Sequence, residues 1–229
     1  MNDKKRMYSE FAYVLGMLIL AFATALMEKA DLGMSMVVAP AYLLHLKVSE
    51  FIPSFSFGVA EYVFQAFLII ILSVILRKAK LGYLFSFITA VIYGFMLDAS
   101  IGILRPIPAE EMPARILLYV LGMVLCSLGV ALLFHTYISP EAYELFVKEL
   151  CSQYGFPVGT TKTVYDCVSC LVGVIMSFAF FGFGNFVGVK LGTIICALVN
   201  GRMIGFIDSF LGSHFEFKDA FGLRHFFEI

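Results

Sequence analysis

Few side chains in this sequence could do chemistry, and several of them fall within long apolar stretches. Arg202 lies about midway along the apolar segment 191–210, with Asn200 close by. Because a charge inside a membrane is costly, such residues are functional candidates. Asp208 follows six residues after Arg202 and therefore falls on another helical face. Arg202 needs either an acidic partner from another helix or an anionic ligand, and the sequence fits both interpretations.

Two acidic residues, Glu61 and Asp166, occupy similar places in two other apolar segments and are candidate partners of Arg202. Lys162 precedes Asp166 by four residues, so these two side chains can pair along one helix face. That spacing favours a local ion pair at a helix end over a ligand site. Glu61 has no basic neighbour in the sequence and is the better candidate for binding a proton or a cation.

Polar residues also mark places where helices begin or end. Ser35 closes the charged run 28–35 and could cap a short helix, whose N-terminus would then attract anions. The run 139–141 has the order Ser-Pro-Glu, which is typical of a helix start. Asp98 and Asp208 are predicted to cap the ends of their segments. These features are architectural unless the short helices point into a cavity.

Other chemistries have weaker support. Cys167 and Cys170 have redox spacing and suggest a membrane thiol–disulfide oxidoreductase as an alternative, although their position inside an apolar segment favours simple packing. The four histidines are scattered without metal-ligand spacing, so neither a metal nor another cofactor is predicted. The net charge of −1 argues against a nucleic-acid binder. We do not expect an enzyme.

The elements that must position these residues follow from the composition. Hydrophobic residues make up 61% of the chain and charged residues 14%, whereas globular domains are about 45–50% apolar and about 25% charged. A membrane helix needs about 20 mostly apolar residues. The sequence therefore predicts an all-α polytopic membrane bundle with six main transmembrane helices. The six stretches are about 10–28, 61–77 with added length from 51–60, 81–104, the stretch between Arg115 and His135, the stretch between Asp166 and Lys190 with a start near Thr160, and 191–210.

Two further segments, 33–48 and 139–154, do not fit a simple span, because the first is short and the second is amphipathic. Each is predicted to form a short helix, and the two are expected on opposite faces of the membrane. Either could be re-entrant or lie at the interface. If both spanned the membrane, there would be eight spans rather than six.

Basic residues favour an orientation with both chain ends in the cytoplasm. The segments predicted inside hold ten Lys and Arg residues, and those predicted outside hold five. The loop with Arg77, Lys78 and Lys80 carries the most weight because it is very short.

The chain also contains an internal repeat. The Leu-Gly-Met sequence at 15–17 recurs at 121–123, an offset of 106, and the Lys-Leu-Gly sequence at 80–82 recurs at 190–192, an offset of 110. Halves of about 10–104 and 114–212, followed by a cytoplasmic tail at 213–229, would each hold three spans and one short helix. Three is an odd number, so the second half must be inverted relative to the first. Inverted repeats are typical of transporters, although a duplicated scaffold would also have them.

The segments 26–35 and 192–208 resemble two motifs of the bacterial YczE/YyaS/YitT-like integral membrane proteins. The first is similar to the K-A-D/N-L-G-x-S-P segment after that family's first span, and the second to its G-T-I-x-x-A-L-x-x-G-x-x-I-D segment in the last span. The likeness covers about residues 10–212, although Met36 and Val37 stand where the family usually has Pro-Trp. The resemblance implies a bacterial membrane protein, often taken for a transporter, without an established substrate.

Together these features predict a secondary transporter or permease of a small solute, which could be anionic, with binding near the membrane midplane between the two halves. We expect a multi-pass protein of the bacterial inner membrane, whose partners are membrane lipid and a small solute; a homo-oligomer is also compatible. A non-transporting scaffold or accessory subunit is the main alternative. The candidate binding residues are Arg202, Asn200, Glu61, Asp166, Lys162 and Ser35.

Overall fold

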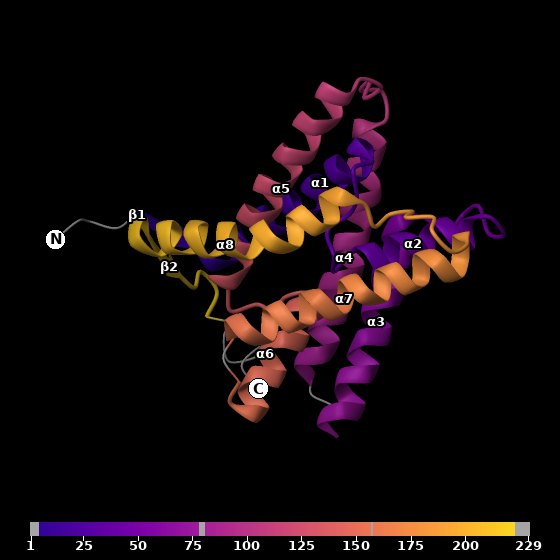
Figure 1. Ribbon diagram of the computed structural model, residues 1–229. Helices are drawn as coiled ribbons and strands as arrows, with labels where there is room; N and C mark the ends of the chain where they lie inside the picture. The colour runs from indigo at the N-terminus through magenta and orange to yellow at the C-terminus, as the bar shows by residue number, and fades with distance from the viewer. Residues whose placement is uncertain (1–4, 78–80, 157, 223–229) are drawn as a thin grey trace.

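The computed structural model describes residues 5–77, 81–156 and 158–222, and these residues form eight helices and two short strands (Figure 1). Six of the helices are long and apolar enough to cross a membrane, which confirms the predicted polytopic α-helical membrane protein. The six are α1 (Ser9–Ala30), α3 (Phe57–Leu76), α4 (Leu81–Leu104), α5 (Met112–Phe134), α7 (Val158–Phe181) and α8 (Leu191–His214).

The two short helices are α2 (Ala39–Ser49) and α6 (Ala142–Tyr154). Both exist where the sequence predicted short helices, but they begin a few residues later than the predicted starts at 33 and 139. Each begins among buried residues and ends at an exposed residue, Glu50 after α2 and Tyr154 in α6. The N-termini of both short helices therefore lie inside the bundle.

The central pair of helices, α1 and α5, packs through the same contact twice. A Cβ on Gly16 would lie 3.1 Å from the carbonyl oxygen of Gly129, and a Cβ on Gly122 would lie 2.9 Å from that of Ala23. Gly122 is the repeat counterpart of Gly16, and Gly129 that of Ala23, at the offset of 106 found in the sequence. An inverted repeat predicts such an exchange of equivalent contacts between two antiparallel helices. The boundaries of the two halves stay predictions.

The two halves differ in how their last two helices pack. In the first half, α3 and α4 approach so closely that a Cβ on Gly58 would overlap the carbonyl oxygen of Gly94. In the second half, α7 and α8 make few contacts with each other, and α8 packs mainly on α5. Figure 1 shows α7 and α8 lying separate from each other across the near side of the bundle. The second half is therefore the more loosely packed of the two.

Two aspartates contact the ends of other helices, whereas the sequence predicted that each would cap the end of its own segment. Asp98 of α4 accepts hydrogen bonds from the backbone N–H of Gly58, at 2.8 Å, and from the hydroxyl of Ser56. It therefore stabilises the start of α3. Asp208 of α8 contacts His135 at the end of α5, where His135 Nε2 lies 3.1 Å from Asp208 Oδ1.

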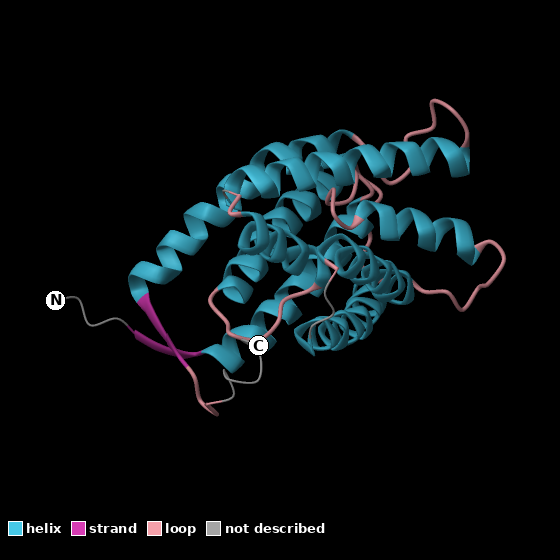
Figure 2. Ribbon diagram, turned by 90° about the horizontal axis from the view of Figure 1, so that it is seen from below, coloured by secondary structure: helices cyan, strands magenta, loops and turns pink. Residues whose placement is uncertain are grey.

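Two four-residue strands join the ends of the described chain. β1 (Lys5–Tyr8) pairs in parallel with β2 (Phe215–Lys218), and Lys5 lies opposite Phe215. Figure 2 shows the two strands crossing at one end of the helical bundle. The sequence did not predict these strands. Lys4, Lys78, Lys80 and Arg224, which were used for the predicted orientation, lie outside the described residues, and the side of the membrane on which the strands lie stays a prediction.

Candidate functional site

A cavity of about 30 Å³ lies where the two short helices begin. Its wall includes residues 35–38, which precede α2, and Glu141, Tyr143 and Glu144 at the start of α6. Positions 35 and 38 are the repeat counterparts of 141 and 144 at the offset of 106. The cavity is therefore lined by segments that the predicted repeat makes equivalent, and its volume is sufficient for about two water molecules.

Side chains of α3 and α4 hold the start of α6 at the cavity. Thr89 donates a hydrogen bond to the carbonyl oxygen of Ser139 at 3.1 Å, and Ser86 donates one to that of Pro140 at 2.5 Å. The side-chain oxygen of Gln65 accepts from the backbone N–H of Ala142 at 3.0 Å. These contacts bind the polar backbone groups that precede the helix, so the helix begins at Ala142 rather than behind a Ser139 cap.

Ser35 also does not cap a helix through its side chain. Its carbonyl oxygen accepts hydrogen bonds from the backbone N–H groups of Val38, at 3.1 Å, and Ala39, at 2.8 Å. The resulting turn leads into α2, and Val38 occupies the N-cap position without a side-chain hydrogen bond. Ser35 is buried and lines the cavity.

One ion cluster lies on the α6–α7 side of the cavity. Lys162 Nζ lies 3.2 Å from Asp166 Oδ1 and 3.3 Å from Glu144 Oε1. The predicted local pairing of Lys162 with Asp166 is confirmed, and Glu144 is an additional partner that the sequence did not indicate. All three side chains line the cavity.

A second acidic cluster lies next to the first and is completely buried. Glu61 is 0% exposed and Glu141 is 3% exposed. The amide nitrogen of Gln65 donates to both, at 3.3 Å to Glu61 Oε2 and 2.9 Å to Glu141 Oε2, and the hydroxyl of Tyr143 donates to Glu61 Oε2 at 2.8 Å. The other carboxylate oxygen of each glutamate, Oε1, has no hydrogen-bond partner.

Neither buried glutamate takes part in an ion pair within the described part of the chain. Burial raises the pKa of Glu141, which lies outside the six spans, well above the usual range of a glutamate, and the charges of Glu144 and Glu61 raise it further. The hydrogen bond from Gln65 acts in the opposite direction but is the smaller effect. Glu141 therefore has a strong tendency to hold a proton.

The helix α8 places its two candidate residues on different faces. Asn200 is buried, lines the cavity and accepts a hydrogen bond from Ser127 at 2.7 Å. Arg202 is exposed and is not among the cavity-lining residues. Residues two positions apart on an α-helix point about 200° apart, so Asn200 and Arg202 point in nearly opposite directions. Arg202 is thus separated from the other candidates.

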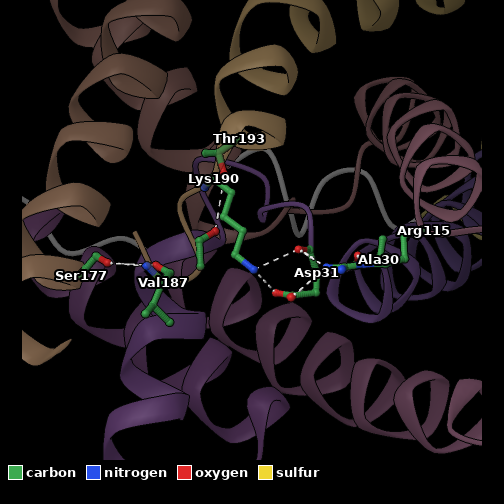
Figure 3. Close-up of polar contacts among 8 residues, drawn as sticks. Ala30, Asp31, Arg115, Ser177, Val187, Lys190 and Thr193 are labelled. Carbon is green, nitrogen blue, oxygen red and sulfur yellow. Dashed lines mark hydrogen bonds and ion pairs between the residues drawn. The ribbon is translucent and has the colours of Figure 1, made fainter. Parts of the chain in front are cut away.

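A third polar cluster ties the end of α1 to α5 and to the start of α8 (Figure 3). Asp31, in the left-handed conformation with φ 50°, ends α1. Its Oδ2 lies 2.9 Å from Arg115 Nη2, and its carbonyl oxygen accepts from Lys190 Nζ at 3.0 Å. Nearby, the backbone N–H of Gly192 donates to the carbonyl oxygen of Leu32 at 3.0 Å. The two segments that carry the sequence resemblance, 26–35 and 192–208, thus meet at this cluster.

The cysteine pair with redox spacing lies on α7. Cys167 is exposed, Cys170 is partly buried, and both are free thiols. Neither lines the cavity.

A family model described as a family of unknown function, DUF6198, matches residues 7–209. The chain belongs to this family. The DUF6198 match takes in all three polar clusters and the cavity, so these features lie within the family's own region. No curated protein and no solved structure matches the chain.

Proposed function

We propose that this DUF6198 protein is a secondary transporter of a small cationic solute, which binds in the cavity where α2 and α6 begin. The observation that carries the proposal is the composition of the cavity wall. It contains three carboxylates, those of Glu141, Glu144 and Asp166, and a single ammonium group, that of Lys162. Two of the carboxylates already share Lys162, and a positively charged solute would balance the remaining charge.

The sequence alone suggested a solute that could be anionic, because Arg202 and the N-terminus of α2 both favour negative charge. The exposed position of Arg202 removes the first of these reasons. The N-terminal ends of α2 and α6 each contribute only a partial positive charge of roughly half a unit. Together, the ionised carboxylates of Glu141, Glu144 and Asp166 exceed these partial charges and the single ammonium group of Lys162, so the cavity favours a cation.

Transport, rather than a scaffold role, is supported by the architecture around the cavity. Inverted repeats that each place the N-terminus of a short helix beside one central site are typical of secondary transporters. A cavity of about 30 Å³ has room only for water-sized contents, so a larger solute would require the surrounding helices to move. The loose contact between α7 and α8 gives the second half room for that movement. The energy would come from an ion gradient or from a partner ATPase.

The proposal can be tested by flux measurements in proteoliposomes. We expect small ammonium and guanidinium compounds to enter faster than carboxylates of the same size. Glu144→Gln and Asp166→Asn should each lower cation flux at least tenfold. Glu50→Gln, which removes an exposed acid paired with Lys47, is the matched control and should transport normally. The cationic site would be overturned if only anions were transported and Arg202→Ala abolished that transport. If no compound were transported and an enzyme co-purified with the protein, the scaffold role would be favoured.

Several expectations from the sequence accompany this proposal. The proposed relationship is to the YczE/YyaS/YitT-like proteins, the proposed location is the bacterial inner membrane, and both chain ends are proposed to lie in the cytoplasm. Single cysteines at Ala109 and Ala220 in a cysteine-free background would test the orientation. An impermeant thiol reagent should label position 109 in intact cells and position 220 only in broken cells. The opposite pattern would reverse the orientation.

A further inference from the structure

We propose that Glu61 and Glu141 together bind one exchangeable proton, and that a cation in the cavity displaces it through Glu141. The first half of this proposal stands on the buried acidic cluster alone, whereas the second half rests on the proposed function. The result would be an exchange of protons for solute cations.

The hydrogen bonds of the cluster leave one position free on each acid. Gln65 uses its amide nitrogen to reach both glutamates and its amide oxygen to accept from Ala142. Tyr143 donates to Glu61. The three bonds donated to the glutamates end on their Oε2 atoms, while both glutamate Oε1 atoms are buried without a partner. A proton on one Oε1 would remove one of the two charges without breaking any bond in the cluster.

The electrostatic cost of burying two ionised carboxylates side by side favours a proton on one of them. Moving an ionised carboxylate from water into a protein interior costs several kcal/mol unless a positive charge compensates it. Neither glutamate has an ion-pair partner within the described part of the chain. Two neighbouring carboxylates also repel each other, so a pair of this kind retains a proton at a pH at which a single exposed glutamate would not.

A metal ion fits this cluster less well than a proton does. The groups around the two Oε2 atoms are N–H and O–H donors, and a metal ion needs oxygen lone pairs instead. Among the residues that the structure describes, no group of three His, Cys, Asp or Glu residues is arranged to hold a metal.

The surroundings of the pair contain one basic group, and it is engaged elsewhere. Lys162 reaches the pair only through Glu144 and also binds Asp166. Glu144 adds a further acid, and the remaining neighbours are phenols and one thiol, which leave the negative charge of the pair uncompensated. The titratable side chains around the two glutamates are Tyr13 of α1, Tyr93 of α4, Cys126 of α5, Tyr143 and Glu144 of α6, and Lys162 and Tyr165 of α7.

Glu141 is the residue that links the proton to the solute, because it belongs to both sites. It lines the cavity and is joined to Glu61 through Gln65. A cation beside Glu141 stabilises its ionised form, so the O–H bond of the acid breaks and the proton passes to water on the side to which the cavity opens. When the cation leaves, a proton returns from water. Each cation bound therefore releases one proton.

Infrared spectroscopy of the purified protein in lipid nanodiscs tests the proton site without any solute. The wild type should show a protonated-carboxyl band at neutral pH that shifts in D₂O and disappears at high pH. The band should be lost in Glu61→Gln/Glu141→Gln and retained in Glu50→Gln. In Tyr143→Phe, which removes one donor to ionised Glu61, the band should persist to higher pH. A wild-type titration identical to that of the double glutamine variant would overturn the proton site.

The link to the solute needs a second measurement, with methylammonium chloride as the probe in weakly buffered solution containing a pH dye. Wild-type protein should release about one proton per site on addition of methylammonium, and Glu141→Gln should release none. If the carboxyl band is present but no proton is released, the displacement step is wrong while the proton site stands. If cations are transported but the band is absent, the proposed function stands and the proton site is wrong.

Discussion

Gly33 lies against Thr193 so closely that a Cβ on the glycine would be 2.6 Å from the threonine hydroxyl oxygen and 2.9 Å from its backbone nitrogen. The two residues belong to different halves of the repeat. Gly33 also has φ 115°, a conformation that side chains rarely adopt. The contact between the two halves at this end of the molecule therefore depends on the absence of a side chain.

Gly33→Ala should lower the free energy of unfolding by about 2 kcal/mol or more, because backbone strain adds to a steric clash. Gly155→Ala is the matched control, since Gly155 also has a positive φ, 69°, but no atom lies within 4 Å of an added Cβ. It should cost about 1 kcal/mol. Unfolding in mixed micelles would measure both, and equal losses would contradict the importance of the contact.

Asp31→Asn, at the end of α1, should lower the free energy of unfolding by only about 0.5–1 kcal/mol at low salt, because exposed ion pairs contribute little to stability. Asparagine tolerates the left-handed conformation of this position, so the variant removes charge while retaining the turn. The difference from the wild type should shrink as salt is added, since ions screen exposed pairs. A loss that is independent of salt would mean that Arg115 and Lys190 do not interact with Asp31 through charge.

Gly58→Ala should force α3 and α4 apart and lower the free energy of unfolding by about 3 kcal/mol, because the added Cβ would meet backbone rather than a movable side chain. Gly102→Ala, also on α4, meets nothing within 4 Å and should raise stability by about 0.5 kcal/mol through helix propensity. Thermal unfolding of the two variants in detergent gives the comparison. A neutral Gly58→Ala variant would show that the two helices do not pack as closely as described.

The stability of the protein should fall as the pH rises above the usual range of a glutamate. In this window folded Glu141, whose pKa is raised by burial, holds a proton that the unfolded chain has released. The folded state then binds more protons than the unfolded state, so the free energy of unfolding decreases by at most about 1.4 kcal/mol per pH unit for this group. Unfolding at pH 5, 6, 7 and 8 would measure the slope, which Glu141→Gln should reduce and Glu50→Gln should not.

The sequence predicted features that depend on neighbours along the chain. The six spans follow from the length of each apolar run, and the pairing of Lys162 with Asp166 follows from one helical turn of spacing. Contacts between distant segments left no such signal. Glu61 and Glu141 are joined only in three dimensions, so the sequence around Glu141 indicates no more than a helix start.

Two errors have a simple geometric origin. Closeness in the sequence predicts that Arg202 and Asn200 share one binding site. A helix turns about 200° over two residues, however, so the two side chains point apart. The predicted helix start at Ser139 was wrong because hydroxyls of α4 donate hydrogen bonds to the backbone carbonyl oxygens of Ser139 and Pro140. A local pattern cannot reveal a competitor that lies about 50 residues away.

The parallel pairing of β1 with β2 has a consequence for the order in which the molecule can be assembled. The paired residues, such as Lys5 and Phe215, are separated by more than 200 residues, and the entropy lost on closing a loop grows with its length. The first strand must therefore wait, unpaired, until the last helix has been synthesised and inserted. The pairing of β1 with β2 therefore forms as a final step, after all six spans have been made.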